Sequence, residues 1–222
     1  MEKLMPLKYL IKESFSMYVE KFWLFVKLVL LNLLIFLPAL LFAALFFARG
    51  GFLLFAMFLI IFLLFIACIA VILFLVKVAL VVAVKDRGQN PSAKYYLKSA
   101  WNYLGSYAFI TLLVGLCVLG GTILLIVPGV IFAIWFMFSG YVFVSEGIKG
   151  KLALRRSREL VTGYWWAVFG RMALLVVASL IISYIPLVGS IANLFFTMPF
   201  SVIYGYSIYE DLKRVRSLPA KI

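Results

Sequence analysis

The chain has 222 residues, of which 67% are hydrophobic and only 13% are charged. This composition excludes an ordinary water-soluble domain, in which apolar residues make up about half of the sequence, and is typical of a polytopic membrane protein. The net charge of +13 at pH 7 does not predict a nucleic-acid partner, because basic residues also set membrane topology and are attracted to an anionic inner leaflet.

Long apolar runs predict the membrane-spanning helices. Each run reaches the roughly 20 residues that a helix needs to cross the hydrocarbon core. The third run is too long for one crossing, and the Gly120–Gly121 and Pro128–Gly129 pairs in its middle predict a break into two helices. The sequence therefore predicts an all-α polytopic protein with six transmembrane helices. The five runs cover residues 22–48, 52–84, 104–144, 164–185 and 191–209.

The distribution of charge predicts the orientation of these spans. Lysines and arginines precede the first span, lie between the second and third and between the fourth and fifth, and follow the sixth, whereas the opposite loops carry only Arg49. Because basic loops resist translocation, we expect both termini in the cytoplasm of a bacterium, with a multi-pass protein in its inner membrane. The charged segment before the first run shows no cleavable signal, so the first span would target the chain.

Three related segments precede apolar hairpins. KYLIKESFSMYVEKFW from Lys8 is similar to KYYLKSAWNYLGSYAF from Lys94, and the segment from Lys151 aligns less closely. In each segment apolar positions form one helical stripe and basic residues lie on the other face. These patterns predict three cytoplasmic amphipathic interfacial helices, each followed by a hairpin, in one domain over residues 1–222. The units of this internal repeat are about 4–84, 90–146 and 147–216.

The third segment illustrates the pattern. Ala153, Leu154, Ser157, Leu160, Val161 and Tyr164 share its apolar face. Such a helix would lie at headgroup level with that face toward the lipid. Tryptophans near each helix would act as interfacial anchors, because indole rings favour the membrane–water boundary. These anchors are Trp23, Trp101, Trp165 and Trp166. The helices could connect and anchor the spans, or recognise a particular lipid or protein partner.

Two basic residues fall within predicted spans, where charge is costly. Lys27 and Arg171 lie at matching positions, one to two turns into the first span of their units. Their long side chains could reach back to lipid phosphates, or they could line a basic pocket between helices for an anionic headgroup. Together with Arg155 and Arg158 of the third amphipathic helix, they are the candidate contacts for anionic lipid headgroups.

The sequence predicts no catalytic, metal or cofactor site. It contains no His, which removes the commonest general base and a frequent metal ligand. No phosphate-binding glycine loop or nucleophile motif is present. Cys68 and Cys117 fall within predicted spans, where cysteine acts as a small apolar residue.

Residues 126–170, IVPGVIFAIWFMFSGYVFVSEGIKGKLALRRSRELVTGYWWAVFG, resemble a known family. They are similar to the integral membrane domain found ahead of some bacterial glycerophosphoryl diester phosphodiesterases and to its free-standing six-span relatives. The resemblance implies fold and membrane location. It does not imply phosphodiesterase activity, because the His-dependent chemistry of the hydrolase domain has no histidine here. The residues that carry it are Pro128, Gly129, Glu146, Gly147, Ala153, Leu154, Ser157, Glu159, Leu160, Trp165 and Trp166.

These observations lead to two main hypotheses. The first is a non-enzymatic inner-membrane protein that interacts with anionic phospholipids, or with a membrane or cytoplasmic protein, through its basic interfacial helices. The alternative is a transporter or flippase for an anionic or phospholipid-like substrate, with Lys27 and Arg171 as its headgroup site. A membrane enzyme of lipid metabolism, dependent on a soluble partner for catalytic groups, ranks third.

Overall fold

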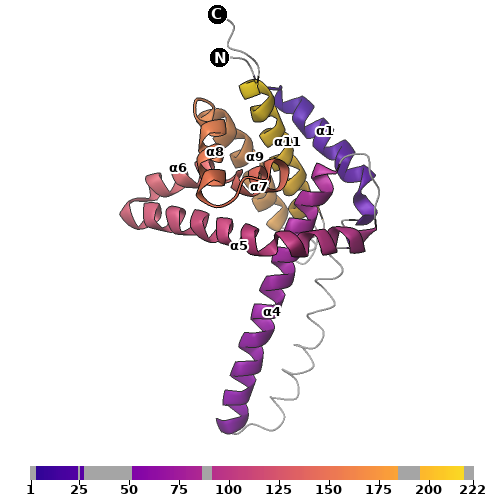
Figure 1. The fold of residues 1–222 in the computed structure, drawn as a ribbon, viewed down its shortest axis with the longest axis vertical. Coiled ribbons are helices and arrows are strands. Elements are labelled where there is room, and N and C mark those ends of the chain that lie inside the picture. Colours follow the sequence, from indigo (N-terminus) through magenta and orange to yellow (C-terminus); the bar gives the residue numbers. More distant parts are fainter. Residues whose placement is uncertain (1–3, 25, 28–51, 87–91, 185–195, 218–222) are drawn as a thin grey trace, which may run out of the picture.

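The structure is a computed structural model that describes residues 4–24, 26–27, 52–86, 92–184 and 196–217 (Figure 1). Within these ranges every regular element is a helix. The predicted first span, over most of its length, and the start of the predicted sixth span lie outside the described residues. In chain order the helices are α1 (Leu7–Glu20), α4 (Phe52–Lys85), α5 (Ala93–Leu124), α6 (Ile126–Phe136), α7 (Ser139–Glu146), α8 (Lys151–Val161), α9 (Trp165–Ser183) and α11 (Met198–Ser217).

Among the described residues, three helical segments are long and apolar enough to cross a membrane. They are Ala93–Leu124, Ile126–Glu146 and Trp165–Ser183. The second combines α6 and α7, which follow each other with only Met137 and Phe138 between them, both in right-handed helical conformation. For the described residues the predicted all-helical class is thereby confirmed, together with helices that could cross a membrane.

The predicted break in the long third run is confirmed, and it falls at Leu125. This residue is extended, with φ −164° and ψ 151°, so that α5 ends before it and α6 begins after it. Pro128 lies in the first turn of α6, where the missing N–H of proline leaves no hydrogen bond unmade. The predicted helix breakers therefore lie inside the helices, on either side of the turn.

Two glycines allow the α5–α6 hairpin to close tightly. A Cβ atom on Gly129 would lie 3.0 Å from the backbone nitrogen of Thr122, and one on Gly121 would lie 2.8 Å from the Phe132 ring. Small residues at such positions let two helices approach closely, which is a common way for helices to associate in membranes. The closed hairpin depends on the absence of side chains at these two positions.

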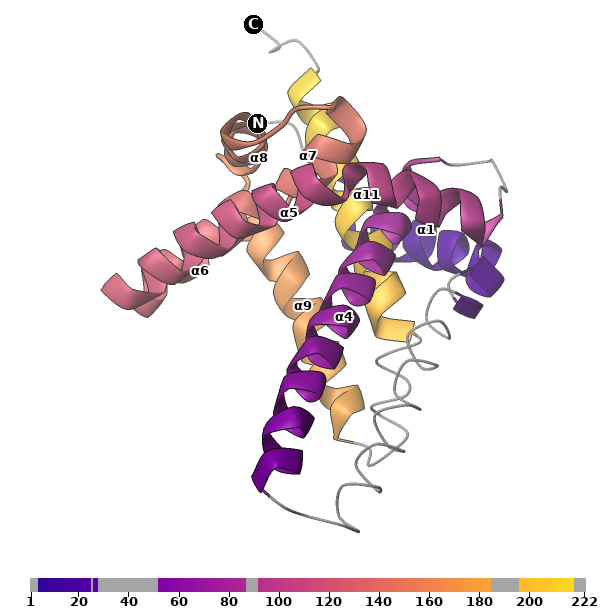
Figure 2. The ribbon, with the colours of Figure 1, turned by 60° about the horizontal axis from the view of Figure 1, so that its bottom comes forward.

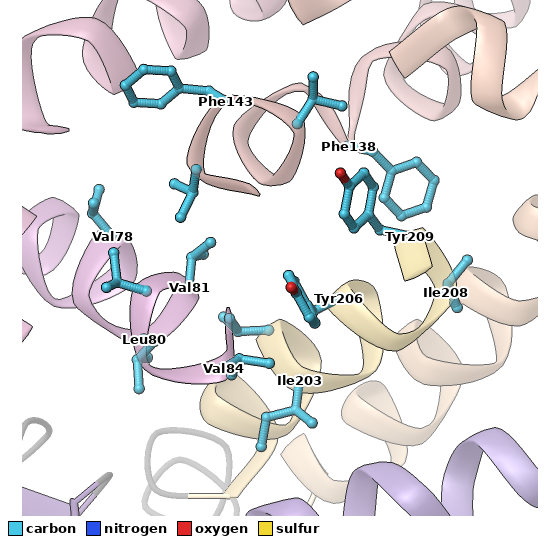
Figure 3. Close-up of a cluster of buried hydrophobic side chains, with 14 of the residues drawn as sticks. Val78, Leu80, Val81, Val84, Phe138, Phe143, Ile203, Tyr206, Ile208 and Tyr209 are labelled. Carbon is cyan, nitrogen blue, oxygen red and sulfur yellow. The ribbon is translucent and has the colours of Figure 1, made fainter. Parts of the chain in front are cut away.

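The hydrophobic core gathers at one end of the molecule, around α11. Residues 202–209 of α11 are all buried, as are residues 78–84 of α4. Figure 3 shows these two helices meeting Phe138 and Phe143 from the α7 region. On another side of α11, α1 packs through Leu10, Ser14 and Tyr18. This packed end positions every charged cluster described below.

Away from this core the apolar helices separate. Both views show α5 and α6 running across α4 instead of alongside it (Figures 1 and 2). Near the tip of the α5–α6 hairpin, Ile123 and Ile126 are 84% and 75% exposed, and Tyr184 after α9 is 89% exposed. The protein itself leaves these apolar surfaces uncovered, as expected for surfaces that face lipid.

The three predicted amphipathic segments differ in their surroundings. Residues 93–103 are helical as expected, but they form the first turns of α5 without a break before the apolar part. By contrast, α8 is a separate helix because backbone with positive φ bounds it on both sides, at Gly150 (φ 60°) and Gly163 (φ 87°). The sequence pattern did not distinguish a separate interfacial helix from the basic start of a span.

The apolar face predicted for α8 is correct, but the surface that it covers is not the one expected. Ala153, Leu154 and Leu160 are buried against the protein, where α8 contacts α6, α7 and α11. The prediction that this face enters the lipid is therefore wrong for the described fold. A helix pattern shows which face is apolar, whereas the neighbouring elements decide whether protein or lipid covers it.

We expect Gly129→Leu to destabilise the protein and Gly120→Leu to leave its stability nearly unchanged. The added side chain at Gly129 would meet the Thr122 backbone, whereas a Cβ at Gly120 has nothing within 4 Å. Overpacking of this kind costs about 1–3 kcal/mol. Unfolding of the detergent-solubilised protein by sodium dodecyl sulfate, followed by tryptophan fluorescence, measures the difference. Equal midpoints for the two variants would contradict the tight hairpin.

Candidate functional site

The buried carboxylate of Asp211 in α11 organises the charged end of the protein. Its Oδ2 lies 3.2 Å from Nη1 of Arg171 in α9, and its Oδ1 lies 2.9 Å from Nη2 of Arg214. The backbone N–H of Met5, just before α1, also donates to Oδ2 at 2.8 Å. We call these four residues the Asp211 cluster. It ties the start of the chain to α9 and α11.

Arg171 is fully engaged within this cluster. It is 8% exposed, and its Nη2 donates to the carbonyl oxygen of Met5 at 2.6 Å in addition to its ion pair with Asp211. A buried charge needs such partners, because loss of hydration costs several kcal/mol per ion. The guanidinium is therefore occupied by protein groups in this structure. The sequence pattern by itself does not pair Asp211 with Arg171, because the two residues are 40 positions apart.

Lys27, the predicted counterpart of Arg171, is exposed. No hydrogen bond or shared acidic partner joins the two residues in the part of the chain that the structure describes. Their matching positions in the sequence thus correspond to different surroundings. The structure shows no basic pocket formed by this pair within the described ranges.

A second polar cluster surrounds Glu146 at the end of α7. Its carboxylate accepts a hydrogen bond of 2.6 Å from the Tyr209 hydroxyl and lies 3.3 Å from Nε of Arg156 and 3.8 Å from Nζ of Lys213. This cluster joins α7, α8 and α11. Sequence reasoning singled out Glu146 only as part of the resemblance, so its partners were missed.

Two lysines cap the carboxyl ends of helices. Lys21, which is buried, donates to the carbonyl oxygen of Ala83 at 2.5 Å and to that of Asp86 at 3.0 Å, at the end of α4. Lys85 donates to the Val144 carbonyl oxygen at 2.9 Å, near the end of α7. Cations at these positions satisfy carbonyl groups that lack helical partners and complement the helix dipole. These two lysines therefore have a structural role.

The two predicted arginine contacts on α8 remain at the surface. Arg155 is paired with Glu159 at 3.2 Å, one helical turn away, and the Arg155 side chain is 77% exposed. Arg158 lies over the Trp135 ring, with its guanidinium carbon 4.4 Å from the ring centroid. An exposed pair of this kind contributes little to stability. Both arginines are accessible to groups outside the protein.

Three of the four predicted tryptophan anchors are prominent on the surface. Trp23, Trp101 and Trp166 are 73%, 64% and 78% exposed. Trp165 is half-buried and stacks on Phe169, with ring centroids 5.2 Å apart. The indoles of these three residues are open to the surroundings, whereas Trp165 packs within the protein.

One face of α5 changes from basic to apolar along its length. Lys94, Lys98 and Trp101 are exposed at its start, and Leu112 and Leu116 are 60% and 59% exposed further along the same face. Within each of these two groups, successive residues are three or four positions apart, and this spacing places side chains in one stripe along a helix. We call this stripe the α5 face. Sequence reasoning found its basic part but treated the apolar part as a separate element.

Within the described ranges no group of three or more His, Cys, Asp or Glu side chains could hold a metal ion. The described residues assemble charge pairs and an amphipathic surface.

Over the described residues the protein is all-helical, with three helical segments that could cross a membrane and a charged, packed end. Comparison with models of protein families, with curated proteins and with solved structures yields no match to this chain.

We expect removal of either buried partner to destabilise the protein strongly. Asp211→Asn removes the carboxylate that pairs with buried Arg171, at a cost of about 3–5 kcal/mol. Arg171→Met should cost somewhat less, because the buried Asp211 carboxylate keeps the half-exposed Arg214 as a cationic partner. The double variant should lose less than the sum, because neither charge is then left alone. The test is a double-mutant cycle. The free energy of unfolding is measured in mixed detergent micelles for the unchanged protein, the two single variants and the double variant.

Arg155→Gln is the matched control, since it breaks an exposed pair and should cost about 1 kcal/mol or less. Strictly additive effects of Arg171→Met and Asp211→Asn would show that the two side chains are not coupled.

Proposed function

We propose that the protein is a non-enzymatic, multi-pass protein of the bacterial cytoplasmic membrane, whose basic end binds the headgroups of anionic phospholipids. The observation that carries this proposal is the α5 face, on which exposed Lys94 and Lys98 are followed by Trp101 and then by exposed leucines. Cations favour the anionic headgroup layer, indoles favour the interface and leucines favour the hydrocarbon. The order along α5 matches the order of these layers in one leaflet.

Surface features of other helices support the same proposal. On α1, Lys8 and Lys12 are exposed, and Trp23 follows shortly after the helix. On α8, Arg155 and Arg158 face outward, and Trp166 at the start of α9 is exposed. Basic side chains and tryptophans thus recur together on three parts of the surface. Several weak contacts of this kind add up to a preference for anionic lipid.

The proposed topology extends beyond the described helices. It has six spans, cytoplasmic termini and three repeated units of about 4–84, 90–146 and 147–216. The basic loops support this orientation, and the similar positions of α1 and α8 before apolar segments support the repeat. Membership in the family of integral membrane domains associated with glycerophosphoryl diester phosphodiesterases is also a proposal, and it rests on the residues in 126–170 that carry the resemblance.

The alternative of a transporter that uses Lys27 and Arg171 as its headgroup site is less well supported. Arg171 is held by Asp211 and the Met5 carbonyl, so it would have to leave a buried ion pair to receive a substrate. Lipid binding requires no such rearrangement, because Lys94 and Lys98 are already at the surface. A protein partner on the same basic surface would show itself as binding that does not depend on lipid charge.

Native mass spectrometry of the full chain in detergent tests the proposal. The protein is titrated separately with phosphatidylglycerol and with phosphatidylcholine. Each lysine near an anionic surface contributes about 1 kcal/mol, so Lys94→Gln with Lys98→Gln should weaken phosphatidylglycerol binding about thirtyfold. Phosphatidylcholine binding should change little.

The matched control replaces the same two residues by arginine, which keeps the charge and should retain phosphatidylglycerol binding. Phosphatidylglycerol binding that is unaffected in the glutamine variant would refute the assignment of the α5 face.

A further inference from the structure

An open apolar crevice separates α4 from α5. It has a volume of about 540 Å³ and is lined by Val71 and Phe74 of α4 and by α5 residues from Leu104 to Leu119. The two helices cross near the packed end and then diverge, as both ribbon views show (Figures 1 and 2). Its volume falls in the range of about 300–1,000 Å³ that is typical of sites for small ligands.

The crevice follows from the way in which the two helices pack. At the crossing, the Phe74 and Tyr107 rings meet edge to face, with centroids 5.4 Å apart. Beyond this contact the α5 wall carries small residues, Ala108 and Gly115, and a Cβ atom on Gly115 would have nothing within 4 Å. These two small residues leave space between the larger leucine side chains that line the same wall.

Cations lie at one end of both walls. On α4, Lys77 follows the lining residue Phe74 by one turn, and its side chain is exposed within an otherwise apolar stretch. On α5, Lys98 and Trp101 precede the lining residue Leu104 on the exposed side of the helix. A lysine in an apolar helix is costly unless it meets an anion or water. The crevice thus combines an apolar cleft with positive charge at the end nearest the packed core.

We propose that this crevice binds one acyl chain of an anionic phospholipid, whose phosphate is held by Lys77. The inference rests on the proposed function and names a specific site for it. A lipid fits both parts of the site, because its chain matches the apolar walls and its phosphate matches the ammonium group. A polypeptide segment could fill the apolar part but would leave Lys77 without an anion.

Three variants of the full chain test this site in the same lipid titrations. Lys77→Gln should reduce the preference for phosphatidylglycerol over phosphatidylcholine about fivefold, the effect of one lysine near an anionic surface. Gly115→Leu fills the crevice and should weaken the binding of both lipids. Gly120→Leu adds the same side chain to the same helix outside the lining residues, and it should behave as the unchanged protein.

Ala108→Leu, on the same wall as Gly115, is the second filling variant, and it keeps the test valid if Gly115→Leu does not fold. Lipid binding that is unchanged in both Lys77→Gln and the filling variants overturns the inference. If Lys94→Gln with Lys98→Gln still weakens phosphatidylglycerol binding in that case, the proposed function stands without the crevice. Equal binding of the two lipids to the unchanged protein would refute both.

A cysteine placed at Gly115 distinguishes the remaining occupants. Its efficient crosslinking to a second copy, or to residues 28–51 of the same chain, in lipid-containing membranes would show that polypeptide fills the crevice, and would overturn the inference. Labelling by a lipid that carries a photoreactive group in its acyl chain is the expected result.

Discussion

The ion pair between Asp211 and Arg171 is the interaction on which the charged end of this protein depends. Both groups are buried, so Arg171 depends on the Asp211 carboxylate for its charge pairing, and Asp211 is paired with both Arg171 and Arg214. Asp211 also accepts from the Met5 amide, which fixes the start of the chain against α11. A single carboxylate thus holds three separate parts of the sequence together, and the hydrophobic contacts of α11 complete the packed core around it.

The position of this core explains the rest of the architecture. Because α11 packs against α1, α8 and the C-terminal part of α4, these segments are fixed, while the apolar parts of α4 and α5 cross instead of lying side by side. The α4–α5 crevice opens where the two helices leave their crossing at Phe74 and Tyr107. A soluble protein could not leave such surfaces uncovered, but a bilayer can cover them with lipid. The crevice and the exposed apolar surfaces, which support lipid binding, therefore lie where the packed core ends.

The charged residues divide into two groups by their surroundings. Lys21 and Arg171 look like membrane-surface cations in the sequence, yet Lys21 caps a helix and Arg171 pairs with Asp211 inside the protein. The sequence around Lys94 and Lys98 has a similar composition, but both of these side chains are exposed. Net charge and residue type could not separate the two groups, because burial depends on contacts between segments far apart in the chain.

The sequence by itself determined the helical, membrane-spanning class, the break between α5 and α6 and the apolar face of α8, because these follow from local composition and periodicity. Only the tertiary structure decided that the α8 face packs on protein, that Arg171 belongs to Asp211 and that α5 continues unbroken from its lysines into its leucines. Residues that are 40 positions apart, such as Arg171 and Asp211, meet only when the whole core forms. The pairing of buried charges is therefore a property of the fold and not of any one segment.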